Sequence, residues 1–224
     1  MIAPEPAGLS CDDFIMSVSA ATRLVGKIHA KLVFGRRTAV LTNMLAQHLR
    51  PSQAVLDIGC GDGTIGALLQ QRIPGLEVCG VETHLRPECG IPCRPYDGSH
   101  LPFPDAEFDV CLLVDVLHHT REIGALLNEA ARVSRAYVLI KDHLDENFAD
   151  HITLKLMDWV GNRPHGVRLP YNYQSRRAWA QHFAAAALTE VSWTEDVPLY
   201  PAPVSWIAGR RLHFVALLRK KASP

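Results

Sequence analysis

Three glycines follow an acid in the segment VLDIGCGDGTIG, residues 55–66, and this spacing suits a ligand-binding loop. Gly59, Gly61 and Gly63 alternate with other residues just after Asp57. Glycine lets a ligand approach the backbone, and the N–H groups at a helix start favour phosphate-like or carboxylate groups. The acid Glu82 ends the next strand-like run, where it could accept hydrogen bonds from ribose hydroxyls. The pattern predicts a nucleotide-type crevice; its D-x-G-x-G-x-G order departs from the dinucleotide fingerprint, so a nicotinamide enzyme is the weaker alternative.

Two short stretches could supply acid–base chemistry. DVLHHT contains His118 and His119, and IKDH contains Asp142 and His143, each where a strand is expected to end. A histidine beside a carboxylate can remove a proton near neutral pH, because its ordinary pKa is about 6.5 and the acid fixes its tautomer. His118 is the first candidate base. The alternatives are that one histidine of the pair only packs or contacts a cofactor, or that these groups bind magnesium.

The chain has six cysteines, which in a chain of this length without a recognisable signal peptide indicate reduced thiols. Cys60, Cys79 and Cys111 are expected to be small core residues. Cys89 and Cys93 form a C-x3-C pattern that could hold a metal, but no second cysteine or histidine pair is suitably spaced nearby. Structural zinc sites use four ligands, so the sequence predicts a plain loop and no metal.

Alternating strand-like and helix-like runs must position these residues. Strands are expected at 53–59, 76–82, 108–117 and 135–143, and helices at 63–73 and 122–134. This alternation predicts an α/β fold with a parallel sheet and helices on both faces. Two helices are expected within residues 12–49. After a polar and aromatic stretch to about 174, a helix at 176–188 and two β-like runs, 188–197 and 210–221, are expected, the runs pairing antiparallel at the sheet edge.

Composition excludes several classes of protein. The 224 residues are 48% hydrophobic, which is enough for one good-sized core and one domain. Lys plus Arg equals Asp plus Glu, 23 each, so no overall charge favours nucleic acid or an anionic membrane. No apolar run reaches the roughly 18 residues of a membrane span, and the N-terminus has no signal-peptide pattern, so a cytoplasmic location is expected.

Four motifs in order resemble the class I S-adenosylmethionine-dependent methyltransferases, closest to the small-molecule branch called type 11. They are VLDIGCGDG, Glu82 in GVE, Asp97 in YDGSHLPFPDAEFDVCLLVDVLHH, and the final strand pair. The resemblance covers about residues 50–145. It implies a Rossmann-like, seven-stranded, mostly parallel sheet with the last strand antiparallel, an N-terminal helical cap, and S-adenosylmethionine as methyl donor with S-adenosylhomocysteine as product.

The resemblance also implies roles for individual residues. Those implied to bind the cofactor are Asp57, Ile58, Gly59, Cys60, Gly61, Glu82, Thr83, Asp97, Gly98, Asp115 and Val116. Glu82 would take the ribose diol and Asp97 the adenine amino group. Asp57 would hold the loop, and the carbonyls of Asp115 and Val116 would face the methionine ammonium. One departure is the short link from Glu82 to Asp97, which is expected to lack the usual full helix and to leave the adenine edge more open.

The expected organisation is a single domain with four parts: a helical cap (1–50), a cofactor-binding core (51–145), a lid or acceptor segment (146–175) and a C-terminal helix and strand pair (176–224). Residues 157–173 are expected to form a roof over the acceptor through Trp159, His165, Tyr171 and Tyr173. The alternative is that these aromatics form a satellite core. Arg36 and Arg37 are expected on a solvated face, the alternative being that they close the cofactor site.

The sequence therefore predicts methyl transfer to a small molecule, at oxygen, with a His and Asp base drawn from His118, His119, Asp142 and His143, as in related O-methyltransferases. Carbon or nitrogen methylation, and a cofactor-binding protein without turnover, are the alternatives. No nucleic-acid partner is expected, because an Asn-Pro-Pro-Tyr-type base pocket is missing after the fourth strand. A monomer or homodimer is expected, and the sequence does not identify the acceptor.

Overall fold

One mixed sheet organises the chain, and the computed structural model describes residues 35–162, 170–200, 202, 205–208 and 211–221. The strand order is β3-β2-β1-β4-β5-β7-β6. The strands are β1 (Ala54–Ile58), β2 (Glu77–Glu82), β3 (Cys93–Pro95), β4 (Phe108–Val114), β5 (Ser134–His143), β6 (Leu188–Thr194) and β7 (His213–Lys220). β7 runs antiparallel to both β5 and β6. The predicted Rossmann-like sheet is confirmed, including the antiparallel pair at its edge: β6 is the outermost strand there and β7 lies between β6 and β5, while β3 forms the opposite edge.

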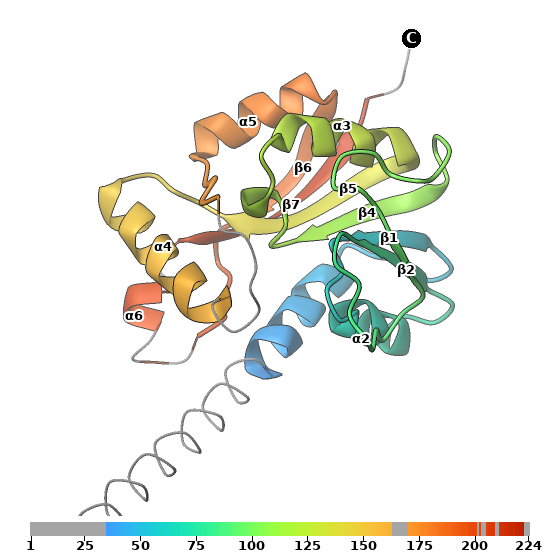
Figure 1. Cartoon of the computed structure of the whole chain (residues 1–224), viewed down its shortest axis with the longest axis horizontal. Helices are drawn as coiled ribbons and strands as arrows, with labels where there is room; N and C mark the ends of the chain where they lie inside the picture. Colours follow the sequence, from blue (N-terminus) through green and yellow to red (C-terminus); the bar gives the residue numbers. More distant parts are fainter. Residues whose placement is uncertain (1–34, 163–169, 201, 203–204, 209–210, 222–224) are drawn as a thin grey trace, which may run out of the picture.

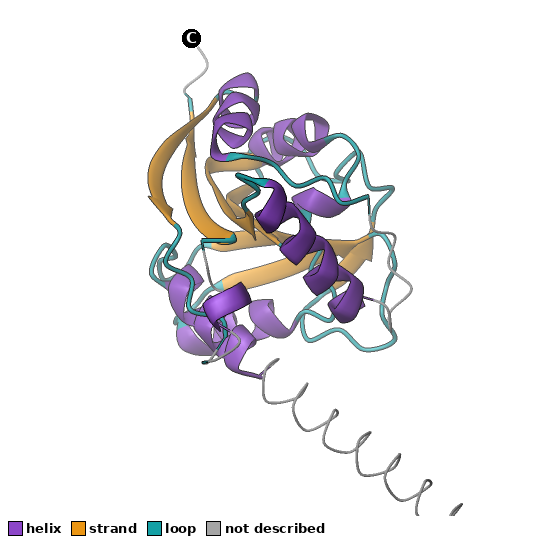
Figure 2. Ribbon diagram, turned by 90° about the vertical axis from the view of Figure 1, so that its left-hand side faces the viewer, coloured by secondary structure: helices purple, strands orange, loops and turns teal. Residues whose placement is uncertain are grey.

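Helices cover both faces of this sheet (Figures 1 and 2). They are a helix over residues 35–46, α2 (Thr64–Arg72), α3 (Ile123–Val133), α4 (Phe148–Asn162), α5 (Arg176–Ala185) and the short α6 (Ser205–Ala208). A 3-10 turn, η1 (Leu117–His119), follows β4. Within the described residues, no helix is both long and apolar enough to cross a membrane.

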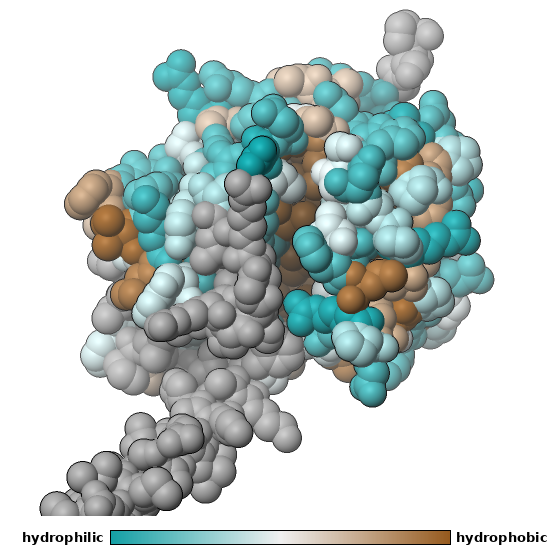
Figure 3. Space-filling model, in the orientation of Figure 1, coloured by the Kyte–Doolittle hydropathy of each residue, from teal (hydrophilic) through white to brown (hydrophobic). Residues whose placement is uncertain are grey.

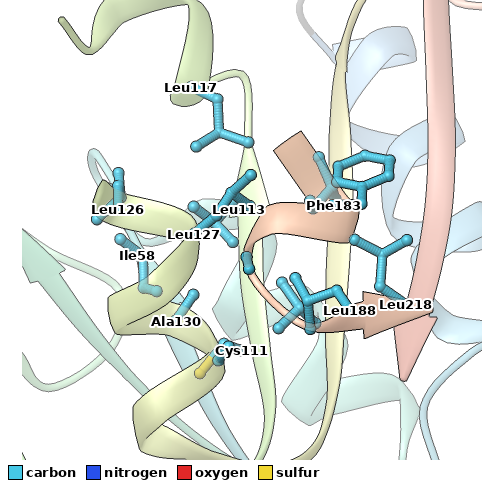
Figure 4. Close-up of a cluster of buried hydrophobic side chains, with 14 of the residues drawn as sticks. Ile58, Cys111, Leu113, Leu117, Leu126, Leu127, Ala130, Phe183, Leu188 and Leu218 are labelled. Atoms are coloured by element: carbon cyan, nitrogen blue, oxygen red, sulfur yellow. The ribbon is translucent and has the colours of Figure 1, made fainter. Parts of the chain in front are cut away.

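Alternation along the central strands divides the core in two. Along β4, Cys111 and Leu113 pack into one buried cluster and Val110 and Leu112 into the other. The first cluster takes the apolar face of α3 together with α5, as Figure 4 shows for Leu127 and Phe183. The second takes the helix over residues 35–46 and α2. Both faces are therefore buried, as a parallel sheet requires, and the strand ends are left to carry the polar residues.

Three sequence expectations need correction or restriction. The segment 157–173 is not a loop throughout, because α4 continues to Asn162. The short strand β3 was not predicted, since its three residues CRP contain no hydrophobic run. Of the two helices expected within residues 12–49, only residues 35–46 are described, and they are helical. As predicted, the described link between β2 and β3 contains no helix.

Candidate cofactor and acceptor site

The glycine loop between β1 and α2 adopts a backbone that glycine favours. Gly59, Gly61 and Gly63 have φ values of 71°, 59° and 70°. A Cβ atom on Gly59 would lie 2.6 Å from Val116 Cγ2, so this glycine lets the loop pack against the end of β4. On Gly61 a Cβ would meet only Arg86, at 3.9 Å, so the backbone there is open to a ligand.

Two acids flank this loop. Glu82, at the end of β2, accepts hydrogen bonds from the backbone N–H of Gly61 at 2.9 Å and of Thr83 at 2.8 Å. Asp57, the fourth residue of β1, is buried. Burial, together with the charge of Glu82, raises the pKa of Asp57 to about 7. The two carboxylates face the loop from adjacent strands, which is an arrangement that suits ribose hydroxyls and a ligand cation.

Two residues predicted to contact the cofactor direct their side chains elsewhere. Ile58 is fully buried in the core beneath α3. The Cys60 sulfur lies 3.4 Å from the Cys93 sulfur.

The turn of Asp97 and Gly98 follows β3. The exposed Asp97 carboxylate accepts hydrogen bonds from the backbone N–H of Ser99 at 2.8 Å and of His100 at 2.7 Å, and these bonds lower its pKa to about 2. Gly98 has a φ of 86°, and a Cβ on it would lie 3.4 Å from the Thr83 methyl group. The turn is thus held beside the end of β2, where the adenine side of a nucleotide site would be.

Asp115 directly follows β4 and has a left-handed conformation, with φ 56°. Its carboxylate pairs with Lys141 of β5 and with Arg37 of the helix over residues 35–46. Burial would raise the pKa of Asp115, but these two cations hold it well below its ordinary value. Arg37 therefore joins the cap helix to the sheet end, contrary to the expected solvated face. The Val116 carbonyl accepts a hydrogen bond from the His119 N–H at 3.0 Å.

His118 lies between two carboxylates and is almost fully buried, with 1% of its side chain exposed. Its Nδ1 is 2.6 Å from Asp142 Oδ1, and its Nε2 is 3.6 Å from Asp158 Oδ2. The other Asp142 oxygen accepts the Leu117 N–H at 3.0 Å. Burial alone would lower the pKa of His118, but Asp142 outweighs it and the pKa is raised. The ring is thus fixed in orientation and favours its protonated form.

The neighbouring histidines favour the neutral form. The His119 ring lies against His118 in a tilted arrangement, with centroids 4.0 Å apart and an interplanar angle of 46°. Burial plus the charge of His118 lowers the pKa of His119 to about 4. Its Nδ1 is buried and has no hydrogen-bond partner among the described residues. Burial, and then the charge of His118, also lowers the pKa of His143. Of these three histidines, His118 is therefore the one that favours the protonated form.

Part of the predicted roof reaches this cluster. The Tyr173 hydroxyl lies 2.5 Å from Asp158 Oδ2, and its ring stacks on His118 with centroids 5.6 Å apart. Tyr171 and Tyr173 also pack into a small buried group with Leu154, so the satellite-core alternative describes their packing. Trp159 is about half exposed, and His165 lies outside the described residues.

Sequence reasoning missed Asp158 and Lys141, and it gave Arg37 a place at the cofactor site only as the alternative to a solvated face. Lys141 sits within IKDH and Asp158 precedes Trp159, but nothing local marks either as a member of the site. Within the histidine cluster, two sets of side chains could hold a metal ion, because the ligand atoms of each set lie within 4.8 Å of one another: Asp115, His118, Asp142 and His143, and separately His118, His119 and Asp158.

Comparisons with known proteins agree with this geometry. Residues 31–192, most of the chain, match the family described as a methyltransferase domain. An uncharacterized methyltransferase of Mycobacterium sp. (strain KMS) is 37% identical over 90 residues, covering 37% of this chain and 35% of the relative. The 27-O-demethylrifamycin SV methyltransferase of Amycolatopsis mediterranei is 32% identical over 113 residues, covering 44% and 41%. The chain thus matches less than half the length of these relatives.

A solved structure extends the likeness over nearly the whole chain. The Burkholderia thailandensis 1,6-didemethyltoxoflavin-N1-methyltransferase, with 1,6-didemethyltoxoflavin and S-adenosylhomocysteine bound, superimposes with a TM-score of 0.61 at 21% identity. The match covers 98% of this chain and 95% of that chain, which shows a shared fold. With the glycine loop, Glu82 and the strand order in place, the chain belongs to the class I S-adenosylmethionine-dependent methyltransferases.

Proposed function

We propose that this protein transfers a methyl group from S-adenosylmethionine to the oxygen of a small-molecule acceptor. The observation that carries the proposal is the juxtaposition, at the carboxyl ends of adjacent parallel strands, of the glycine loop with Glu82 and of the His118–Asp142 pair. Ligands of open α/β sheets bind at this end of the strands. One half of the crevice suits the cofactor, and the other half suits proton removal from an acceptor.

On the cofactor side, the backbone at Gly59 and Gly61 borders the methionine part of the cofactor. Glu82 accepts hydrogen bonds from the ribose hydroxyls, and Asp97 accepts one from the adenine amino group. The raised pKa of Asp57 makes its charged form costly in the free protein. A cofactor ammonium near this carboxylate would offset that cost, because an adjacent positive charge favours the ionised acid.

The cofactor supplies a methyl group on a positively charged sulfur, which requires no activation by the protein. The chain's own task is to position the acceptor and to take its proton. His118 holds that proton in our proposal, and Asp142 fixes the ring through Nδ1. Because Asp158 and Tyr173 cover the Nε2 side in the described arrangement, the acceptor hydroxyl must displace Asp158 to reach the ring. Losing one carboxylate also lowers the pKa of His118 back toward its ordinary value, which frees Nε2 to accept a proton.

A small-molecule acceptor is supported by a buried, compact cluster and by balanced overall charge, with 23 basic and 23 acidic residues. The Amycolatopsis and Burkholderia enzymes are also named for small-molecule acceptors, one methylated at oxygen and one at nitrogen. An amine or enolisable carbon would need no histidine base, and carbon or nitrogen methylation is therefore the second candidate. A protein that binds the cofactor without turnover is the third.

The test has two stages. Calorimetry on the purified chain should show binding of S-adenosylmethionine and S-adenosylhomocysteine, and tight binding of NADH with neither of these would contradict the proposal. The chain is then incubated with methyl-labelled cofactor and a fractionated metabolite extract. Label recovered in a small molecule, and released by treatments that cleave methyl ethers or esters, supports transfer to oxygen. Label retained on nitrogen or carbon would move the proposal to the second candidate.

A further inference from the structure

Three cysteines converge behind the glycine loop. Cys60 comes from the loop itself, and Cys89 and Cys93 come from the segment that follows β2. The sulfurs of Cys60 and Cys93 are 3.4 Å apart, and the three sulfurs all lie within 4.8 Å of one another. Each of the three residues is partly exposed and each thiol is free. The fold thus adds to the C-x3-C pattern a third sulfur that is distant from it in the sequence.

Two glycines make the room for these sulfurs. A Cβ atom on Gly80 would lie 2.4 Å from the Cys60 sulfur, and one on Gly63 would lie 2.8 Å from the Cys89 sulfur. Neither contact is possible for a larger residue without a shift. The buried Ile91 lies beside both glycines, since a Cβ on Gly63 or on Gly80 would come within 2.9 Å or 3.2 Å of its side chain.

We propose that Cys60, Cys89 and Cys93 form a thiolate site for a thiophilic metal ion such as Zn²⁺. Zinc binds cysteine sulfur at about 2.3 Å, so two sulfurs on one tetrahedral zinc are separated by about 3.8 Å. The observed separations, from 3.4 Å to at most 4.8 Å, bracket that value. Three thiolates leave a fourth position, which water can fill because the cysteines are partly exposed. The ligand set is soft, which disfavours magnesium and calcium.

Proton release should accompany metal uptake. A free cysteine thiol has an ordinary pKa of about 8.5, so it carries a proton at neutral pH when no metal is bound. Thiols must lose those protons to become ligands, and the affinity for zinc should therefore increase with pH.

The site is joined directly to the cofactor loop. The Gly90 N–H donates to the Asp62 carbonyl at 2.8 Å, and the Gly80 N–H donates to the Pro92 carbonyl at 2.8 Å. A metal ion would therefore fix the segment 89–93 against the loop that carries Gly61. The bound ion would thus stabilise the glycine loop.

The experiment is a zinc titration of the reduced, chelator-treated full chain, in competition with a chromogenic chelator. We expect one ion per chain, and Co²⁺ in its place should show thiolate-to-cobalt charge-transfer absorption. Cys93→Ser and Cys89→Ser should each weaken zinc binding by about 100-fold or more, since loss of an outer partner alone costs about 10–100-fold. The matched control is Cys79→Ala. Cys79 lies on the opposite face of β2, where its side chain packs against the other core cluster.

A second measurement needs no variant. Zinc should protect the three cysteines, and not Cys79, from alkylation in the wild-type chain, as identified by peptide mass. Zinc should also raise the unfolding midpoint of the wild type and of Cys79→Ala but not of Cys93→Ser. The proposal is overturned by absence of zinc uptake in the reduced chain, by uptake that Cys93→Ser leaves unchanged, or by cobalt spectra without thiolate absorption. Recovery of a Cys60–Cys93 disulfide together with no metal uptake after reduction would assign the cluster to redox chemistry instead.

Discussion

Both carboxylate oxygens of Glu82 accept backbone hydrogen bonds at the predicted cofactor site, so a substitution of Glu82 is a sensitive test of that site. Its oxygens accept the N–H groups of Gly61 and Thr83. In Glu82→Ala the ribose hydroxyls would lose two charge-assisted hydrogen bonds, which corresponds to about 2–4 kcal/mol of cofactor binding. Calorimetry with S-adenosylhomocysteine measures this. The matched control is Glu88→Ala, an exposed acid in the same segment, and equal losses in both variants would contradict the assigned role.

His118 and Asp142 are the side chains on which proton removal is predicted to depend. His118→Ala should lower turnover by about 10²- to 10⁴-fold while cofactor affinity stays nearly unchanged, because a positioned base contributes about that factor. Asp142→Asn should act in the same direction but less strongly. The measurement is the initial rate with an acceptor that turns over, across pH.

The other histidines discriminate among the alternatives. Full activity in His118→Ala with an inactive His119→Ala or His143→Ala would move the base to that residue. Full activity in all three variants would mean that transfer depends on positioning alone, as expected for an amine or an enolisable carbon.

Asp57 should make the stability of the fold depend on pH. Its pKa is raised from 3.8 to about 7 in the folded protein, so between these values the folded state binds more protons than the unfolded chain. The free energy of unfolding should therefore fall as pH rises through this range, by about 1.4 kcal/mol per pH unit. Denaturant unfolding of Asp57→Asn should lack this contribution, whereas the exposed control Asp196→Asn should retain it. Parallel pH profiles for the wild type and Asp57→Asn would refute the assignment.

Among helices and strands, α4 and the residues after it are predicted to respond to ligands. Asp158 of α4 and Tyr173 meet over His118, and they must part for an acceptor hydroxyl to enter. Residues 157–162 and 170–173 should therefore exchange backbone hydrogens faster in the free protein than with cofactor and acceptor bound. Exchange with and without S-adenosylhomocysteine gives the first comparison, with α5 as an internal reference. Equal, strong protection in both states would favour a purely structural role for this segment.

The helices and strands that were predicted well are those that a continuous stretch of sequence marks by itself. β1, α2 and β2 combine apolar runs with glycine punctuation, and each lies within one or two residues of its expected bounds. β3 was not predicted from the sequence because a strand of three residues is too short to show a hydrophobic periodicity. Most of α4 was not predicted because several of its apolar residues face outward, so its apolar residues do not all mark one buried face.

The candidate site was also only partly predictable from the sequence. The cofactor motif is contiguous in sequence, so Asp57 and the glycines could be named in advance. Arg37, Lys141 and Asp158 come from three separate segments, and only the folded chain brings them to the ends of β4 and β5. The third sulfur of the cysteine group was missed for this reason as well.

The molecular surface carries one feature that ordinary folding does not require. Phe148, Ile152, Leu156 and Trp159 recur along α4 and are 79%, 49%, 60% and 47% exposed. Figure 3 shows hydrophobic side chains gathered at the edge where α4 lies in Figure 1. Exposed apolar patches mark binding sites or association surfaces. The native chain should therefore bind a hydrophobic fluorescent dye, and Phe148→Ser with Leu156→Ser should reduce that signal at least about twofold without lowering stability by more than about 1 kcal/mol.

The control for this surface is Val191→Ser, a single exposed apolar residue on β6. Dye binding that is equally reduced in the control, or unchanged in the α4 variant, would show that the exposed apolar residues of α4 do not form a binding surface.

The fluorescence of the buried Trp179 should report on the state of the histidine cluster. This indole is fully buried, and its N–H donates to the His143 carbonyl at 3.0 Å. Trp159 and Trp206 are exposed, so a water-soluble quencher should extinguish their emission first and leave the blue-shifted light of buried indole. Because the hydrogen bond of Trp179 ends on the residue that follows Asp142, displacement of the histidines by a bound acceptor would alter this residual emission. Acceptor binding could then be followed in real time, with no label and no turnover.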